Sequence, residues 1–288
     1  MSYYFHKANR IFKRLIKPFF LFPFFILLTS FNNVAVDKCN EIIPLVLKSI
    51  NNVKTLKFTF KNTERINGKL ITGIQEIKYT KTPRQYYIRM INPSPNSELL
   101  YIEGKNNNSA TYKPNGFPYL CVNISPYSSL IRKNNHHTIY NIGFDYFGKL
   151  ISTYYNNKKF TFEYKGLVKW NNIVCHKITA YNNNYQILKY KVKNSETIQS
   201  IAKNFLISEY RIIELNPEIE DFDTKLKTNQ IILISNFYCK SIEMYIDTKT
   251  YLPIYQNISD NIGIFEQYEY NKLEVNIDFT SKDFSIEN

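Results

Sequence analysis

Residues 190–235 place a helical pattern inside a sequence that otherwise alternates like a series of β-strands. Thr197 can accept hydrogen bonds from the first-turn N–H groups of one helix, and Ser208 is placed to do the same for a second helix. Asn216-Pro217 ends the second helix, because proline disfavours helical geometry at the residue before it. Short apolar strands flank both helices, so we predict a β-α-α-β unit here. The buried helix faces predicted by this periodicity comprise Ile198, Ile201, Ala202, Phe205, Ile212, Ile213 and Leu215.

The order of landmarks in this unit resembles a LysM domain, a family that binds N-acetylglucosamine polymers such as peptidoglycan and chitin. Tyr-x-Val, a turn ending in Thr, Ile-Ala-x-x-Phe, Leu-Asn-Pro and Gln-x-Ile-x-Ile follow one another in that order. The sequence departs from the usual Gly-Asp before the threonine, where it has Ser195-Glu196, and from the closing proline, where it has Ser235. Asn229 replaces a usual glycine and also tolerates left-handed backbone geometry. We predict that the LysM-like domain covers residues 186–236.

The resemblance implies a sugar site in a shallow groove between two loops of this unit. Backbone amides and hydroxyls would pair with the acetamido group of the sugar, while Ile198 or Ile219 covers its methyl group. A purely structural module is the alternative, since a motif match remains a hypothesis. The implied glycan-binding residues are Asn194, Ser195, Glu196, Thr197 and Ile198 on one side, and Leu215, Asn216, Pro217, Glu218 and Ile219 on the other.

The N-terminal segment, residues 1–36, has the order of a secretory signal peptide. A basic stretch without acidic residues precedes the apolar run Phe19–Leu28, which is interrupted by Pro23. This run is shorter than the roughly 20 residues that a bilayer-spanning helix needs. We therefore expect export, with cleavage near Ala35 or Val36; an uncleaved anchor is the alternative.

The formal net charge of the chain is +13 at pH 7. The segment from Lys189 to Ile234 holds seven basic and seven acidic residues, so the excess charge lies elsewhere. Nucleic acid is one partner for a basic chain, but no nucleic-acid-binding motif accompanies the charge. We expect no nucleic-acid partner, and an anionic envelope surface suits the leader better.

Four widely spaced cysteines remain after the leader: Cys39, Cys121, Cys175 and Cys239. In an exported protein an even set of cysteines permits disulfides, and the sequence cannot choose between the pairings. Buried free thiols are an equally good interpretation. A structural zinc site is disfavoured, because such sites usually use closely spaced pairs.

The rest of the chain predicts an α+β fold built on a curved antiparallel β-sheet, or half-barrel, with covering helices. Asn67-Gly68 and Asn171-Asn172 supply hairpin turns. Because alternation resumes after the helical unit, we predict that the unit is inserted between strands of a discontinuous domain, residues 37–185 and 237–288. The predicted helices are 40–52 and 142–155, with Pro44 in the first turn of the former, and the predicted strands are 56–60, 70–79, 84–91, 98–103, 109–113, 160–170, 173–181, 238–247, 252–258 and 264–273.

This order of elements resembles lipoprotein carriers of the LolA and LppX type, in which a curved sheet wraps an apolar cavity closed by helices. The strings Ser-Pro-Tyr-Ser, Arg-Lys-Asn-Asn-His-His and Phe-Glu-Gln-Tyr-Glu-Tyr resemble an uncharacterised bacterial envelope family, common in Bacteroidetes, that carries a LysM insert in such a domain. The 24 tyrosines and 21 phenylalanines could line a lipid cavity or fill an ordinary β core.

Few polar clusters in the sequence invite a chemical role. Arg132, Lys133, His136 and His137 could contact a phosphate or lipid headgroup, although we favour a structural role for the histidines. Adjacent histidines seldom ligate one metal, so we predict neither a metal site nor a cofactor. Cys175 and its neighbour His176 would face opposite sides of a strand and cannot share a proton, and Glu266 and Glu269 are expected to be solvated.

These features together predict an exported, non-enzymatic protein of the periplasm or cell envelope of a Gram-negative bacterium. Its first predicted partner is peptidoglycan, bound through the LysM-like unit. The alternative is a periplasmic carrier of lipid or lipoprotein in which the insert is secondary. A wall hydrolase is a third class, but no set of catalytic residues supports it.

Overall fold

The computed structural model describes residues 24–117, 120–129 and 131–286, with side chains from residue 38 onward. The chain divides into two compact units, Met1–Val34 and Ala35–Asn288, and the description below concerns the second. The basic and most of the apolar part of the predicted leader lies outside the described residues, and its cleavage stays a prediction. Within the described ranges, no helix is both long and apolar enough to cross a membrane.

The first helix, α1, runs from Phe24 to Asn51 and is much longer than the predicted 40–52. Pro44 therefore lies inside the helix and not in its first turn. Proline removes one backbone hydrogen bond and disfavours the turn before it, so the sequence pattern argued for a start near Asn40. Packing prevails here, because α1 buries Ile42, Ile43 and Val46 completely or nearly so.

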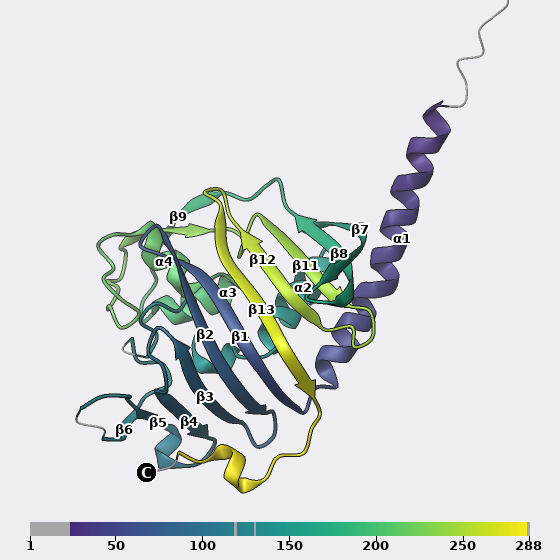
Figure 1. Ribbon diagram of the computed structural model, residues 1–288. Helices are drawn as coiled ribbons and strands as arrows, with labels where there is room; N and C mark the ends of the chain where they lie inside the picture. The colour runs from purple at the N-terminus through teal and green to yellow at the C-terminus, as the bar shows by residue number, and fades with distance from the viewer. Residues whose placement is uncertain (1–23, 118–119, 130, 287–288) are drawn as a thin grey trace, which may run out of the picture. The chain divides into compact units, whose positions relative to one another are not determined.

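Eleven strands form one open antiparallel sheet (Figure 1). Its strands in spatial order are β6 (Val122–Ile124), β5 (Ala110–Lys113), β4 (Glu98–Ile102), β3 (Gln85–Asn92), β2 (Lys69–Thr80), β1 (Thr55–Ile66), β13 (Ile264–Val275), β12 (Pro253–Ser259), β11 (Ser241–Asp247), β8 (Ile173–Tyr181) and β7 (Thr161–Trp170). The predicted α+β fold with a large antiparallel sheet is confirmed. The predicted turn at Asn67-Gly68 joins β1 to β2, and both of its residues have positive φ, at 49° and 73°.

The segment that connects the two edge strands of the sheet covers one of its faces. β6 and β7 are opposite edge strands, and residues 125–160 connect them. This crossover contains α2 (Asp145–Asn156), which lies across one face of the sheet (Figure 1). Gly148 of α2 allows a close approach to α1, because a Cβ there would lie 3.1 Å from Ile50. The predicted helix at 142–155 is observed as α2, and it buries Phe147, Leu150, Ile151 and Tyr154.

A second, two-stranded sheet carries the helical insert. The insert consists of β9 (Ile187–Lys191), α3 (Ile198–Phe205), α4 (Glu209–Leu215) and β10 (Ile231–Ser235). β8 and β11, which flank it in sequence, pair with each other directly, with Tyr181 opposite Ser241. The insert therefore connects two adjacent strands of the large sheet in sequence, and it does not interrupt their pairing. The limits predicted for the two domains stay a prediction.

Candidate functional site

A cavity of about 430 Å³ lies between the covered face of the sheet and the crossover. Its volume falls within the roughly 300–1,000 Å³ typical of small-molecule sites. About half of the lining residues are apolar or aromatic, and exposed residues such as Pro93 and Lys133 lie at its mouth. Its apolar and aromatic lining residues are Phe58, Phe60, Ile71, Ile88, Met90, Leu99, Tyr112, Ile131, Ile139, Ile142, Tyr146, Phe147, Tyr268 and Tyr270.

The alternation along β1 explains why one wall of the cavity changes character. Successive inward side chains are Phe58, Phe60, Asn62 and Glu64, because residues two apart on a strand share a face. Gly73 lies opposite Asn62, and a Cβ at Gly73 would come within 2.6 Å of the Asn62 amide oxygen. The apolar wall thus ends in a buried polar region at the Glu64 end of β1.

That polar region is organised around His136, whose side chain is fully buried. Its Nδ1 lies 2.7 Å from Glu266 Oε1 and its Nε2 lies 2.9 Å from the Arg65 carbonyl oxygen. The His136 backbone N–H donates to Glu64 Oε2 at 2.7 Å, and the Tyr268 hydroxyl donates to Glu64 Oε1 at 2.7 Å. Since both ring nitrogens of His136 face acceptors, both must donate, and the ring is an imidazolium.

The charges around His136 agree with this assignment. Burial by itself lowers the pKa of His136, but the charges of Glu64 and Glu266 and the two ring hydrogen bonds raise it above the ordinary 6.5. For Glu266 burial acts in the opposite direction and raises the pKa, but the two neighbouring imidazoles, His137 and His136, lower it overall. A buried ion pair with further hydrogen bonds therefore anchors the crossover to the sheet.

The predicted headgroup residues do not act as a group in this structure. The Arg132 Nη1 donates to Glu209 at 2.8 Å, its Nη2 donates to the His136 carbonyl oxygen at 2.8 Å, and its guanidinium lies 3.4 Å from the Phe222 ring centroid. Arg132 and His136 are buried and already bonded within the protein, and the predicted headgroup contact stays a prediction. Lys133 is exposed at the cavity mouth, and His137 is partly buried.

The prediction that Glu266 and Glu269 are solvated is wrong, because their exposed fractions are 0% and 7%. Both lie on β13, and Glu266 also accepts the Tyr238 hydroxyl at 2.7 Å. The missed signal is that Glu64 continues the inward alternation of Phe58 and Phe60 on the neighbouring strand. An acidic residue at an inward position requires a buried partner, and His136 supplies it.

The insert has an apolar core of its own. The Thr197 hydroxyl accepts the Ser200 backbone N–H at 3.1 Å, which confirms the predicted cap of α3. Ser208 occupies the cap position of α4, but its hydroxyl makes no capping bond. Phe205 is 40% exposed and packs on Tyr190, so it does not belong to the buried face that was predicted. The buried core residues are Val192, Ile198, Ile201, Ala202, Ile207, Ile212, Ile219, Ile232 and Ile234.

The backbone of the insert shows how the departures from the LysM pattern are accommodated. Ser195, at the position of the usual glycine, has φ 62°, and Asn229 has φ 67°. Both are therefore left-handed, a conformation that is strained for serine and tolerated by asparagine. The Glu196 carboxylate accepts the Tyr190 hydroxyl at 2.8 Å and the Lys193 backbone N–H at 2.8 Å, which fixes the turn.

The implied glycan-binding residues differ in what they offer a ligand. Ile198 and Ile219 are buried at 1% and 2% exposure, so neither side chain can cover a sugar methyl group as predicted. The Asn216 side chain is also buried and bonds to the Ile212 carbonyl and to both backbone groups of Leu233. Glu196 and Leu215 are partly buried. The exposed members are Asn194, Ser195 and Thr197 on one loop, and Pro217 and Glu218 on the other.

The insert is joined to the large sheet by buried charges. Arg65 of β1 donates to Glu214 of α4 through Nε at 2.7 Å and Nη2 at 3.0 Å, and it also pairs with Asp260. Arg211 of α4 pairs with Glu214 at 2.5 Å and with Asp260 at 3.2 Å. The Tyr210 ring stacks on His136 with centroids 4.3 Å apart. Buried ion pairs and a ring stack therefore hold the insert against the large sheet.

All four cysteines are free, which favours the thiol interpretation over disulfides. Cys39, Cys175 and Cys239 are buried and Cys121 is exposed. Burial raises the pKa of Cys39 and of Cys175 to about 11 each, so both stay protonated thiols at neutral pH. Within the described ranges, no cluster of His, Cys, Asp and Glu is suited to hold a metal ion.

Comparison with known proteins confirms the resemblance on which the insert was interpreted. Residues 190–235 match the LysM domain. No curated protein matches the chain. The chain is also similar in fold to several solved structures, at low sequence identity.

Three of these structures illustrate the likeness. An uncharacterized conserved protein from Thermus thermophilus gives TM-score 0.40 at 7% identity, with 87% of this chain and 94% of that chain covered. MucB gives 0.44 at 8% identity, with 87% and 63% covered, so the match spans less than two thirds of MucB. Mycobacterium tuberculosis lipoprotein LppX gives 0.40 at 11% identity, with 83% and 97% covered.

Likeness at this level carries no inference about ligand or activity. The family match is broader, because one family model matches residues 53–204, which are more than half of the chain and run from β1 into α3. The protein therefore belongs to the DUF1571 family, described as proteins of unknown function, and carries a LysM domain within its sheet.

Proposed function

We propose that this protein is an exported, non-enzymatic component of the Gram-negative cell envelope that binds peptidoglycan through its LysM domain. The observation that carries the proposal is the match of residues 190–235 to the LysM domain. The two loops implied in sugar binding keep exposed polar groups, while the apolar residues behind them form the module core. One such contact is weak, so useful binding relies on the repeated sugars of the polymer and on multivalency.

The exposed rims of the groove provide the test. Asn194→Trp and Glu218→Trp place a bulky ring on each rim without touching the module core. Lys189→Trp is the matched control, because Lys189 is exposed on β9 and lies outside both loops. We expect the purified mature chain and the control to pellet with insoluble peptidoglycan, and both rim variants to pellet less. Equal pelleting of all four proteins would contradict the tethering role.

The cavity favours a second function for the large domain, the binding of an acyl chain. An apolar cavity of about 430 Å³ with an exposed mouth is a binding site by the usual criteria of size and lining. Elsewhere on this sheet face side chains fill the space, as where Phe144 packs on Tyr270 with ring centroids 4.4 Å apart. We propose that an acyl ligand fills this space, which is the lipid-carrier alternative.

Met90 and Ile91 of β3 provide a paired test of the acyl ligand. Met90 lines the cavity, whereas Ile91 is 41% exposed and does not. Native mass spectrometry after gentle extraction should show an acyl species on the wild type and on Ile91→Trp, and none on Met90→Trp. An empty wild-type protein that also fails to bind added palmitate would rule out this second function.

A further inference from the structure

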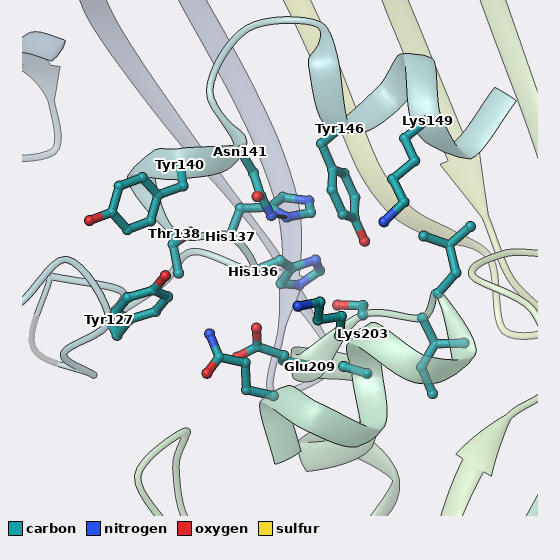
Figure 2. Close-up of a pocket in the computed structure, with 15 residues that line it drawn as sticks. Tyr127, His136, His137, Thr138, Tyr140, Asn141, Tyr146, Lys149, Lys203 and Glu209 are labelled. Carbon is teal, nitrogen blue, oxygen red and sulfur yellow. Dashed lines mark hydrogen bonds between the residues drawn. The ribbon is translucent and has the colours of Figure 1, made fainter. Parts of the chain in front are cut away.

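A second, smaller pocket lies where the LysM insert meets the crossover. We call it the junction pocket; its volume is about 190 Å³ (Figure 2). One wall comes from the crossover and α2, and the other comes from α3, the α3–α4 turn and the first residue of α4. Neither domain alone forms it. Its lining residues are Tyr127, His136, His137, Thr138, Tyr140, Asn141, Tyr146, Lys149, Gln199, Ala202, Lys203, Leu206, Ile207, Ser208 and Glu209.

The charges around the junction pocket do not cancel. Lys149 of α2 and Lys203 of α3 both extend into it (Figure 2), and neither makes an ion pair with any described residue. Glu209, the one carboxylate in the lining, is already bound by Arg132 at 2.8 Å. The imidazolium of His136 is matched by Glu266. Lys149 and Lys203 are both solvent-exposed, so their ammonium groups are accessible to an anion from solution.

A buried hydroxyl in the same lining points to a ligand independently of the lysines. Ser208 is 3% exposed, and its Oγ has no hydrogen-bond partner among the described residues. A buried polar group without a partner is unfavourable, and although Ser208 occupies the cap position of α4, its hydroxyl makes no capping bond and is left available to a ligand. An oxyanion in the pocket would accept a hydrogen bond from it.

The junction pocket also borders the apolar cavity. His137, Thr138, Asn141 and Tyr146 line both spaces, so the two spaces adjoin at these four residues. The hydroxyl of Tyr146 points toward the junction pocket (Figure 2), while its ring also lines the cavity. A ligand that passes these shared residues, with a polar head in the junction pocket and an apolar tail in the cavity, would match the two linings.

We propose that the junction pocket is the subsite for the anionic head of an amphiphile whose tail occupies the cavity, with Lys149, Lys203 and Ser208 as its ligands. This inference rests on the proposed acyl-binding function and adds to it the charge of the ligand. It also gives the LysM insert a second role, since Lys203 and Ser208 come from the insert. The insert then completes the lipid site.

The test compares palmitate with hexadecanol, which has the same tail and no charge, on the full mature chain. We expect palmitate to bind the wild type about tenfold or more tightly than hexadecanol, since each tenfold step is about 1.4 kcal/mol, in the range of a charged hydrogen bond. Lys149→Gln combined with Lys203→Gln should remove this difference and leave hexadecanol binding unchanged. Lys133→Gln, at the cavity mouth, is the control and should change neither affinity.

Ser208→Ala separates a ligand role from a structural one. Because the hydroxyl has no partner among the described residues, its removal should leave the melting temperature unchanged or raise it, while palmitate binding falls severalfold. A lower melting temperature with unchanged palmitate affinity would assign Ser208 to the fold and remove it from the site.

The outcomes distinguish this proposal from the acyl-binding function. If both ligands bind equally well and Met90→Trp blocks both, the acyl function stands and the charged-head subsite is refuted. An affinity that depends on Lys133 would place the head at the mouth and also refute it. If neither amphiphile binds, both proposals fail, and inorganic phosphate binding that depends on Lys149 and Lys203 would then show a site for a free anion only.

Discussion

Replacement of His136 by glutamine tests the charged centre that anchors the crossover. The imidazolium joins Glu266 of β13 to the Arg65 carbonyl of β1 and stacks on Tyr210 of the LysM domain. Glutamine can keep at most part of this hydrogen bonding and carries no charge. The variant therefore leaves a carboxylate in a fully buried site without its main cationic partner.

The magnitude follows from what remains around Glu266. Breaking a buried ion pair by removing one partner is destabilising by about 3–5 kcal/mol, because the other charge stays buried. The Tyr238 hydroxyl still donates to Glu266, and His137 Nε2 lies 3.4 Å away, so the lower half of this range is expected. This loss is a large fraction of the roughly 5–15 kcal/mol that stabilises an ordinary domain.

The pH dependence of the stability tests the charge of His136 independently. The folded-state pKa of His136 is raised above 6.5, so the folded protein holds a proton that the unfolded chain releases first. Its contribution is complete below about pH 6.5 and is lost as the pH rises through the raised value, with a slope of up to about 1.4 kcal/mol per pH unit. His136→Gln should abolish this alkaline decline.

Urea unfolding at several pH values from about 6 to about 9 measures both effects. His176→Gln is the matched control, because His176 is only partly buried and burial lowers its pKa. The control should lose less stability and keep the alkaline decline. A loss of less than about 1 kcal/mol in His136→Gln, together with a wild-type stability that is flat above pH 6.5, would show that His136 is neutral and would refute the assignment.

Three further predictions concern other parts of the chain. Ser195→Gly should stabilise the protein by about 0.5–1 kcal/mol in thermal melts, because glycine relieves the left-handed strain at φ 62°; unchanged stability would argue against that strain. A maleimide should label the native protein once, at Cys121, and four times after unfolding, since the other three thiols are buried. Arg65→Met should lower the free energy of unfolding in urea by about 3–5 kcal/mol, because Glu214 and Asp260 lose a partner. The double variant Arg65→Met with Glu214→Gln should recover part of this stability.

Much of the secondary structure could be predicted from local patterns. Alternation located most strands within about three residues, although β1 continues to Ile66 instead of ending at Phe60 and β6 was not predicted. The Asn67-Gly68 hairpin follows from the left-handed backbone that both residues tolerate. The LysM helices were also predicted, because their periodicity and the Thr197 cap are local. The exceptions are sites where packing overrides a local preference, as at Pro44 inside α1 and at Phe205 on the surface of α3.

The pairing of distant segments could not be predicted in the same way. The first strand of the sheet pairs with the last, so that Glu64 lies opposite Glu266 across about two hundred residues of sequence. Nothing local to either glutamate indicates this, and two like charges side by side would be unfavourable without the intervening His136. The histidine was assigned a structural role from sequence, but its partners became identifiable only once the strands were paired.

The junction between the two domains bears on what a glycan tether can do here. Burying Arg65, Arg211, Glu214 and Asp260 as ion pairs brings little net stability, so stability alone does not explain this network. What such a buried network provides is one defined orientation. The LysM loops that would face the polymer are therefore held at a fixed orientation to the cavity. Under the proposed function, the LysM domain would set the orientation of the cavity relative to the polymer as well as the place where the protein binds.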